Sequence, residues 1–238
     1  MKLEETMSKW FEETGIELSK CGLQNGFDKL VFAALPLLEN YFDSALMILN
    51  EGRRLPAMAL LRCTGEFIAK IIYCLQGDNS QGLSIDERTE SWEKSTFKER
   101  KRYYENIIDR YTGSDCKKVQ SWIDKTDREI AKIKTDNKLP PTAKIFEEAL
   151  GVNHPVGRAG MYQQYLGAVH LDLEILAKTT EEDGNATKFK GDVEYDIERL
   201  KFECLTQLFY FLQAVYNYYK LKNFDNVKDE YKTLIPVS

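Results

Sequence analysis

One segment constrains the fold more than any other: residues 56–76 carry a helical pattern that is apolar on almost every side. Its polar interruptions are Arg62, Thr64, Glu66 and Lys70. A helix that is apolar all round is buried all round. Pro56 suits its first position, where a helix has no use for a backbone N–H. The sequence therefore predicts that this helix lies at the centre of the fold.

Helical spacing dominates the rest of the chain, and no stretch alternates strictly as a strand would. Pro36 is expected to begin or kink the second part of one of these helices. The 14 glycines and 6 prolines are few for 238 residues, which disfavours a turn-rich all-β chain. The prediction is an all-α, single-domain helical bundle over residues 1–222, with an irregular C-terminal tail over 223–238. Further helices are expected over residues 2–23, 27–50, 142–150, 161–178 and 192–222, with a polar loop over 179–191.

Residues 85–136 differ in character, because charges of both signs are dense there and the apolar stripe is sparse. The pattern breaks at Gly113-Ser114, which predicts a protruding charged hairpin of two helices within the domain. A basic cluster beside Tyr103 and Tyr104 could contact nucleic-acid phosphates. Five glutamates interleave with it, which favours a solvated helix face instead. The cluster comprises Lys94, Lys98, Arg100, Lys101 and Arg102.

Charge and targeting signals favour a cytoplasmic protein. Lys and Arg number 33 against 38 Asp and Glu, so the net charge of −5 gives no whole-chain signature of nucleic-acid binding. No signal peptide is visible, and the longest apolar stretch, residues 30–38, is far shorter than the roughly 20 residues of a membrane span. Five cysteines without a C-x-x-C pair are typical of reduced thiols. We expect no membrane association.

Several catalytic motifs are absent. With two histidines, the chain has neither H-E-x-x-H nor the Glu-x-x-His pair of di-iron bundles. Glycine-rich phosphate loops and G-x-S-x-G are missing too. The sequence therefore predicts no metal and no cofactor, and it leaves open whether the protein is an enzyme.

Arg62 and Glu66 are the first candidate site residues, because four-residue spacing puts them on one face of the most apolar helix. Two interpretations stay open. They form a structural ion pair, since isolated buried charges cost several kcal/mol each, or they line a polar pocket inside the bundle.

His170 is the third candidate catalytic residue, and its spacing places it at the margin between the buried and the solvent-exposed faces of its helix. Glu174, one turn on, could orient it or stabilise its charge. Tyr165 lies on the core stripe of the same helix, and Arg158 could hold an anion near its N-terminus. Tyr165, Arg158 and Glu174 are therefore the candidate binding residues.

Two segments resemble a known family. Residues 53–66, continuing to 73–75, resemble the "A-x-x-L-x-R-x-x-x-E" helix of the bacterial domain-of-unknown-function family numbered five-six-seven-seven. A later helix of that family, which ends in histidine, is similar to residues 162–170, with Gly167-Ala168 in the region where the family has serine. The resemblance spans residues 50–176. It implies an all-helical fold and a shared polar cluster of Arg62, Glu66 and His170, without an established activity.

More distantly, such bundles resemble HEPN domains, many of which are ribonucleases of toxin and antiviral systems. Their hallmark is an arginine followed closely by a histidine, whereas eleven residues separate Arg158 from His170 here. This likeness rests on fold analogy.

Two functions follow as hypotheses. The first is a non-catalytic helical module that binds a protein partner or a small ligand, a homodimer included. The second is a metal-independent ribonuclease, in which Arg62 stabilises phosphate charge and His170 acts as general acid or base. The pairing state of Glu66 discriminates between them, because a carboxylate beside Arg62 neutralises it and repels phosphate.

Overall fold

The structure is a computed structural model that describes residues 3–22, 26–76, 82–150, 180–183, 186–189 and 196–235. These residues contain eight α-helices, so the predicted all-α class is confirmed. The chain forms two compact units, Met1–Leu75 with Thr142–Ser238 and Gln76–Pro141. The domain boundaries drawn from the sequence stay a prediction.

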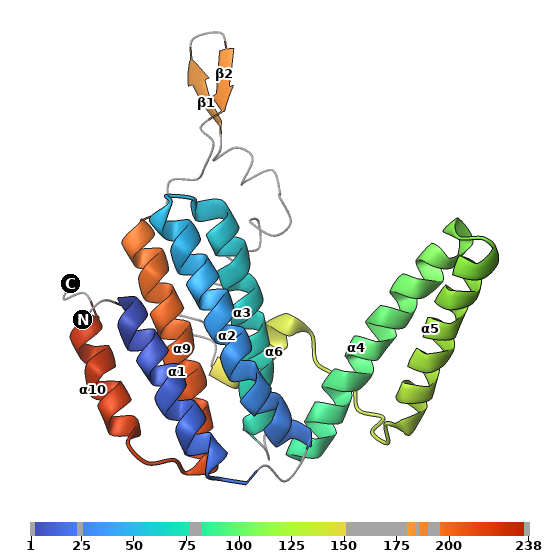
Figure 1. Cartoon of the computed structure of the whole chain (residues 1–238), viewed down its shortest axis with the longest axis horizontal. Helices are drawn as coiled ribbons and strands as arrows, with labels where there is room; N and C mark the ends of the chain where they lie inside the picture. Colours follow the sequence, from blue (N-terminus) through green and yellow to red (C-terminus); the bar gives the residue numbers. More distant parts are fainter. Residues whose placement is uncertain are drawn as a thin grey trace. The chain divides into compact units, whose positions relative to one another are not determined.

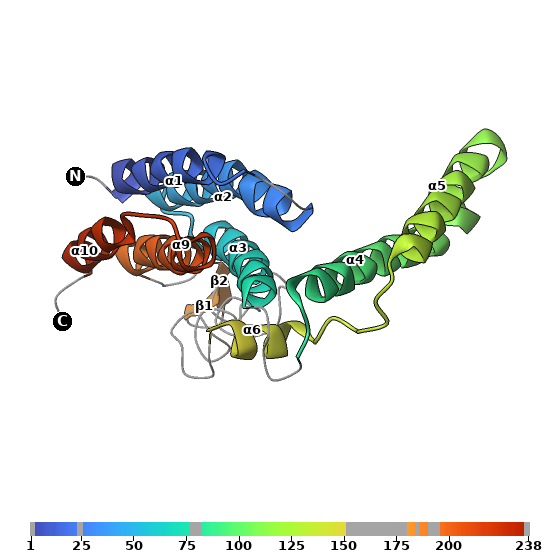
Figure 2. The same ribbon diagram turned by 90° about the horizontal axis from the view of Figure 1, so that it is seen from below.

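The first unit is a helical bundle. Figure 1 shows α1, α2, α3, α9 and α10 side by side, and Figure 2 shows α3 between α2 and α6. The helix α3 packs against α2, α6 and α9, so it is covered on several sides, whereas α9 packs against α1, α2, α3 and α10 and is the more central helix. The helices are α1 (Leu3–Ser19), α2 (Gly26–Asn50), α3 (Arg54–Leu75), α6 (Thr142–Leu150), α9 (Ile197–Tyr219) and α10 (Phe224–Leu234).

The helix α2 is continuous through Pro36, so this proline does not begin a new helix. Proline has no N–H to donate to the carbonyl of Phe32, one turn earlier. Pro36 and Phe32 both lie on the exposed side of α2, where water can satisfy that carbonyl. The cost of an internal proline is therefore reduced at this position.

The irregular tail predicted from residue 223 is wrong, because residues 224–234 form α10. Phe224, Val227 and Tyr231 recur at helical spacing, and Val227 is buried. The Tyr231 ring stacks on that of Phe209 in α9, with 4.0 Å between ring centroids. We conclude that a short apolar stripe, too sparse to stand out in the sequence, docks this helix on α9.

The polar loop predicted over residues 179–191 is also wrong. It contains two antiparallel strands, β1 (Thr180–Asp183) and β2 (Ala186–Phe189), in which Thr180 pairs with Phe189. Neither strand alternates apolar and polar residues, so the hydrophobic pattern of the sequence did not predict them.

The second unit is the helical hairpin expected within residues 85–136. It comprises α4 (Ile85–Ile107), the 3-10 turn η1 (Ile108–Arg110) and α5 (Gly113–Lys132), and α4 packs against α5. Ser84 and Glu87 form a reciprocal capping box that fixes the start of α4. Val119 and Ile123 supply the buried stripe of α5. The spacing of sparse apolar residues was thus sufficient to predict two paired helices.

Candidate functional site

Three charged side chains follow one face of α3. Arg62, Glu66 and Lys70 are spaced by four residues each, so they lie one above the other along the helix. The other side chains of this helix are mostly apolar and buried against α2, α6 and α9. Apart from Arg54 at its first residue, the helix thus carries its charges in one row of Arg62, Glu66 and Lys70, which we call the α3 ion row.

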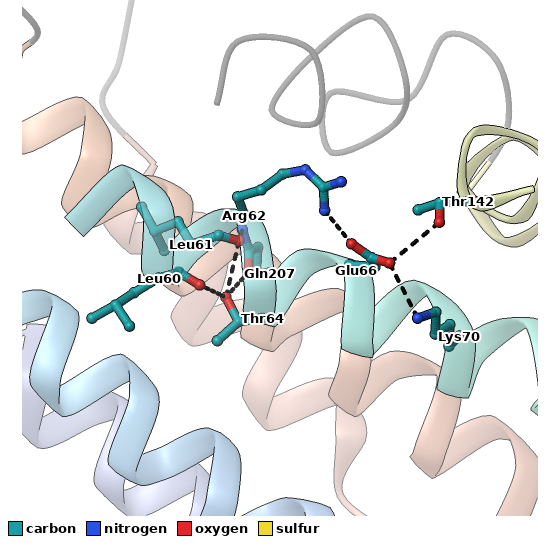
Figure 3. Close-up of polar contacts among 8 residues, drawn as sticks. All are labelled: Leu60, Leu61, Arg62, Thr64, Glu66, Lys70, Thr142 and Gln207. Atoms are coloured by element: carbon teal, nitrogen blue, oxygen red, sulfur yellow. Dashed lines mark hydrogen bonds and ion pairs between the residues drawn. The ribbon is translucent and has the colours of Figure 1, made fainter. Parts of the chain in front are cut away.

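Glu66 is the centre of this row (Figure 3). Arg62 Nη1 donates to Glu66 Oε2 over 2.6 Å, and Lys70 Nζ lies 3.1 Å from Oε1. From α6, the hydroxyl of Thr142 donates to the same Oε1 over 3.2 Å. Both carboxylate oxygens therefore have strong partners, and the carboxylate links α3 to the first residue of α6.

The electrostatics keep Glu66 ionised. Burial is the largest single influence on its pKa and raises it, but the charges and hydrogen bonds of Lys70 and Arg62 outweigh burial and hold the pKa below its ordinary value. Thr142, which donates to Glu66, is the first residue of α6, and a negative charge is favoured at the N-terminus of a helix. The Arg62 side chain is only 8% exposed, so its nearest countercharge is Glu66 rather than an ion from solvent.

A second, uncharged polar contact joins α3 to α9. Thr64 Oγ1 lies 2.7 Å from Gln207 Oε1, and Gln207 Nε2 donates to the carbonyl of Leu61 over 2.9 Å (Figure 3). Gly65 makes room for this contact, because a Cβ there would lie 3.3 Å from Gln207 Nε2. These buried groups satisfy one another, which is the arrangement that buried polar side chains require.

The structure places only part of the predicted site. It brings Arg62 and Glu66 together, whereas Tyr165, Arg158, His170 and Glu174 lie in residues 151–179, outside the residues that it describes. The convergence of His170 on the ion pair therefore stays a prediction. Within the described ranges, no group of three His, Cys, Asp or Glu side chains is placed to hold a metal ion.

Sequence reasoning did not assign three residues of the site: Lys70, Thr142 and Gln207. Lys70 was detectable, because it repeats the four-residue spacing of Arg62 and Glu66. Thr142 begins the helix predicted over residues 142–150, but nothing in the local pattern shows that its hydroxyl donates to Glu66. Gln207 is 143 residues from Thr64, and helical periodicity carries no signal for such a distant partner.

The exposed face of α2 is the other feature that a ligand or partner could use. Phe32, Leu37, Tyr41 and Met47 are each at least 38% exposed. Among the described helices α2 alone is long and apolar enough to cross a membrane, with a mean hydropathy of 1.3 over an 18-residue window that is 39% buried. Core helices of soluble proteins meet the same criterion. Beside this face, a cavity of about 150 Å³ is lined by Leu37, Leu38, Tyr41, Cys63, Thr64 and Phe67.

Comparisons of the chain with protein families, with curated proteins and with solved structures find no match. The resemblances stated from the sequence stay predictions. The function must therefore be argued from the residues themselves.

Proposed function

We propose that this chain is a non-catalytic helical binding module in which the α3 ion row stabilises the packing of α3 against α6. The observation that carries the proposal is the 2.6 Å contact between Arg62 and Glu66. Glu66 is held in turn by Lys70 and Thr142, so the row joins two elements of the bundle. Loss of one partner would leave the buried charge of Arg62 uncompensated, which favours a structural role for the pair.

The alternative, an HEPN-like ribonuclease of a toxin or antiviral defence system, needs Arg62 to stabilise phosphate charge. An incoming phosphate would meet the ionised carboxylate of Glu66, whose pKa is lowered by the same cations that the phosphate would need. Repulsion between the two anions opposes binding in this poorly solvated position. The pairing of Glu66 therefore favours the binding module over the nuclease.

Substitution of Arg62 tests this choice. We expect purified protein to leave RNA intact, and Arg62→Ala to lower the melting temperature by roughly 5–10 °C because it removes a buried partner of Glu66. RNA cleavage and thermal unfolding are measured on the same preparations, with His170→Ala in parallel. Wild-type RNA cleavage that both variants lose while their melting temperatures stay unchanged would contradict the proposal.

The surface proposed for binding is the exposed face of α2. Its residues recur every three or four positions, so they form one continuous strip along the helix. We define this strip, the α2 face, as Lys29, Phe32, Ala33, Pro36, Leu37, Asn40, Tyr41, Asp43, Ser44 and Met47. Apolar residues occupy its middle, and a contiguous exposed apolar patch is typical of an interaction site.

The charges of the α2 face fit a second copy of this chain. Lys29 lies seven residues before Pro36, and Asp43 lies seven residues after it. Neither side chain takes part in an ion pair within the described part of the chain, and both are exposed. When two α2 helices cross antiparallel on a two-fold axis at Pro36, each Lys29 meets the Asp43 of the other copy. The proposed partner is therefore a second copy, bound through a self-complementary face.

Charge exchange gives a sharp test of this homodimer. Lys29→Asp or Asp43→Lys places like charges at both symmetry-related contacts, so we expect each to weaken dimerisation by about tenfold. The double variant Lys29→Asp/Asp43→Lys restores opposite charges and should dimerise as the wild type does. Sedimentation equilibrium over a range of concentrations measures the dissociation constants.

The control for charge is Lys228→Asp, an exposed position on α10 outside the α2 face, which should leave dimerisation unchanged. A chain that stays monomeric at every concentration would overturn the proposed partner. So would a double variant that is no better than the singles, because the two charges would then not face each other.

A further inference from the structure

A polar cleft lies in the helical hairpin, apart from the α3 ion row and the α2 face. One wall is α4, and the other is the segment that follows α5. Its volume of about 320 Å³ falls at the lower end of the range for small-molecule sites. It is lined by Ser91, Lys94, Ser95, Lys98, Asp136, Asn137, Lys138 and Leu139.

Hydrogen bonds to Thr135 fix the shape of the cleft. The Glu90 carboxylate accepts from the backbone N–H of Thr135 over 2.9 Å, and Lys94 Nζ donates to the carbonyl of the same residue. Thr135 Oγ1 in turn accepts from the N–H of Asn137 over 3.2 Å. Thr135 is buried, so these bonds hold the second wall along α4. Such preformed walls reduce the cost of ordering a site on binding.

The charge of the cleft is positive. Three lysines face one carboxylate, Asp136, which lies 3.3 Å from Lys94 and is itself fully exposed. Lys98 and Lys138 form no ion pair with any residue that the structure describes. The carboxylate of Glu90 accepts from the N–H of Thr135, and Glu90 does not line the cleft. The cleft thus presents two ammonium groups without a countercharge, together with hydroxyl and amide donors from Ser95 and Asn137.

We infer that this cleft binds the terminal phosphate groups of a small phosphorylated molecule. A terminal phosphate carries close to two negative charges and three acceptor oxygens, which match two free lysines and neighbouring donors. A phosphodiester of nucleic acid carries one charge per nucleotide and gains affinity from long basic tracks. Here the nearby Lys101 is already paired with Asp127, so the basic track along α4 is interrupted beyond the cleft.

Calorimetric titration of the full chain with inorganic pyrophosphate, with ATP and with a 12-nucleotide oligothymidylate tests the inference. We expect saturable binding of pyrophosphate and ATP that weakens at least about tenfold in Lys98→Gln/Lys138→Gln. In the opposite direction, Asp136→Asn should tighten binding severalfold because it removes the only carboxylate among the lining side chains. All these positions are on the surface of the hairpin, and circular dichroism verifies that the variants are folded.

The matched control is Lys117→Gln/Lys125→Gln, which removes the same charge from exposed positions of α5 that do not line the cleft. Equal loss of binding in this control would show general charge attraction and overturn the inference. Binding of oligothymidylate without pyrophosphate or ATP would overturn it as well, in favour of a nucleic-acid surface. The absence of any saturable binding is the third outcome that would contradict it.

Discussion

Glu66→Ala is expected to lower the free energy of unfolding by about 3 kcal/mol, because it leaves the buried guanidinium of Arg62 without its nearest countercharge. The carboxylate also neutralises Lys70 and accepts from Thr142, so its loss weakens the contact between α3 and α6. For a chain of 238 residues this corresponds to a fall of roughly 6–12 °C in melting temperature. Urea unfolding followed by circular dichroism measures the difference.

The double variant Arg62→Leu/Glu66→Leu separates charge pairing from packing. Replacement of both partners by apolar residues removes the buried charge of Arg62 and leaves only Lys70, whose side chain is 22% exposed, without Glu66. The double variant should therefore be more stable than Glu66→Ala. Glu99→Ala, on an exposed turn of α4, is the control and should change stability by less than about 0.5 kcal/mol. A Glu66→Ala variant as stable as this control would show that the α3 ion row does not stabilise the bundle.

The helices could be predicted from the sequence because their signals are local. The apolar run sufficed to predict α3, although the helix begins at Arg54, so that Pro56 lies in its first turn and is not its first residue. The helix predicted over residues 2–23 is observed as α1, which buries Trp10, Phe11 and Leu18. The same local signal was too sparse for α10, whose docking depends on the stacking of Tyr231 on Phe209. Stability there comes from a tertiary contact, which a window of sequence does not contain.

In the candidate site, too, local contacts could be predicted from the sequence and tertiary contacts could not. The contact between Arg62 and Glu66 follows from four-residue spacing, and the structure confirms it at 2.6 Å. Thr142 lies 76 residues from Glu66, and its position depends on how α6 packs against α3. The sequence left open whether the pair was structural or lined a pocket, because that choice depends on such distant partners. Helix faces were thus predictable, whereas the partners that those faces meet were not.

A second large effect is expected from pH, at Glu203 on α9. Desolvation by burial raises the pKa of its carboxyl to about 7. Its Oε2 has no hydrogen-bond partner in the described part of the chain, and Arg199, 3.4 Å from Oε1, is itself largely exposed. The folded chain therefore holds a proton that the unfolded chain, with a carboxyl pKa of 4.5, releases earlier.

The sign of the pH dependence follows from this difference. The stability contributed by the protonated Glu203 is complete below pH 4.5 and is lost as the pH rises through about 7. Between these limits we expect the free energy of unfolding to fall by about 3 kcal/mol, since each pKa unit corresponds to about 1.4 kcal/mol. Glu203→Gln keeps the shape of the side chain and cannot ionise. This variant should therefore exceed the wild type in stability at pH 8 and approach it at pH 4.5.

Urea unfolding of wild type and Glu203→Gln at half-unit steps between pH 4.5 and 8 measures this difference. Glu198→Gln is the matched control, because Glu198 lies on the same helix but is 79% exposed and pairs with Lys201. Its stability curve should run parallel to that of the wild type, since an exposed carboxyl gains little from losing its charge. Parallel curves for Glu203→Gln and wild type would contradict the prediction, because they would mean that the Glu203 carboxyl titrates alike in the folded and unfolded chains.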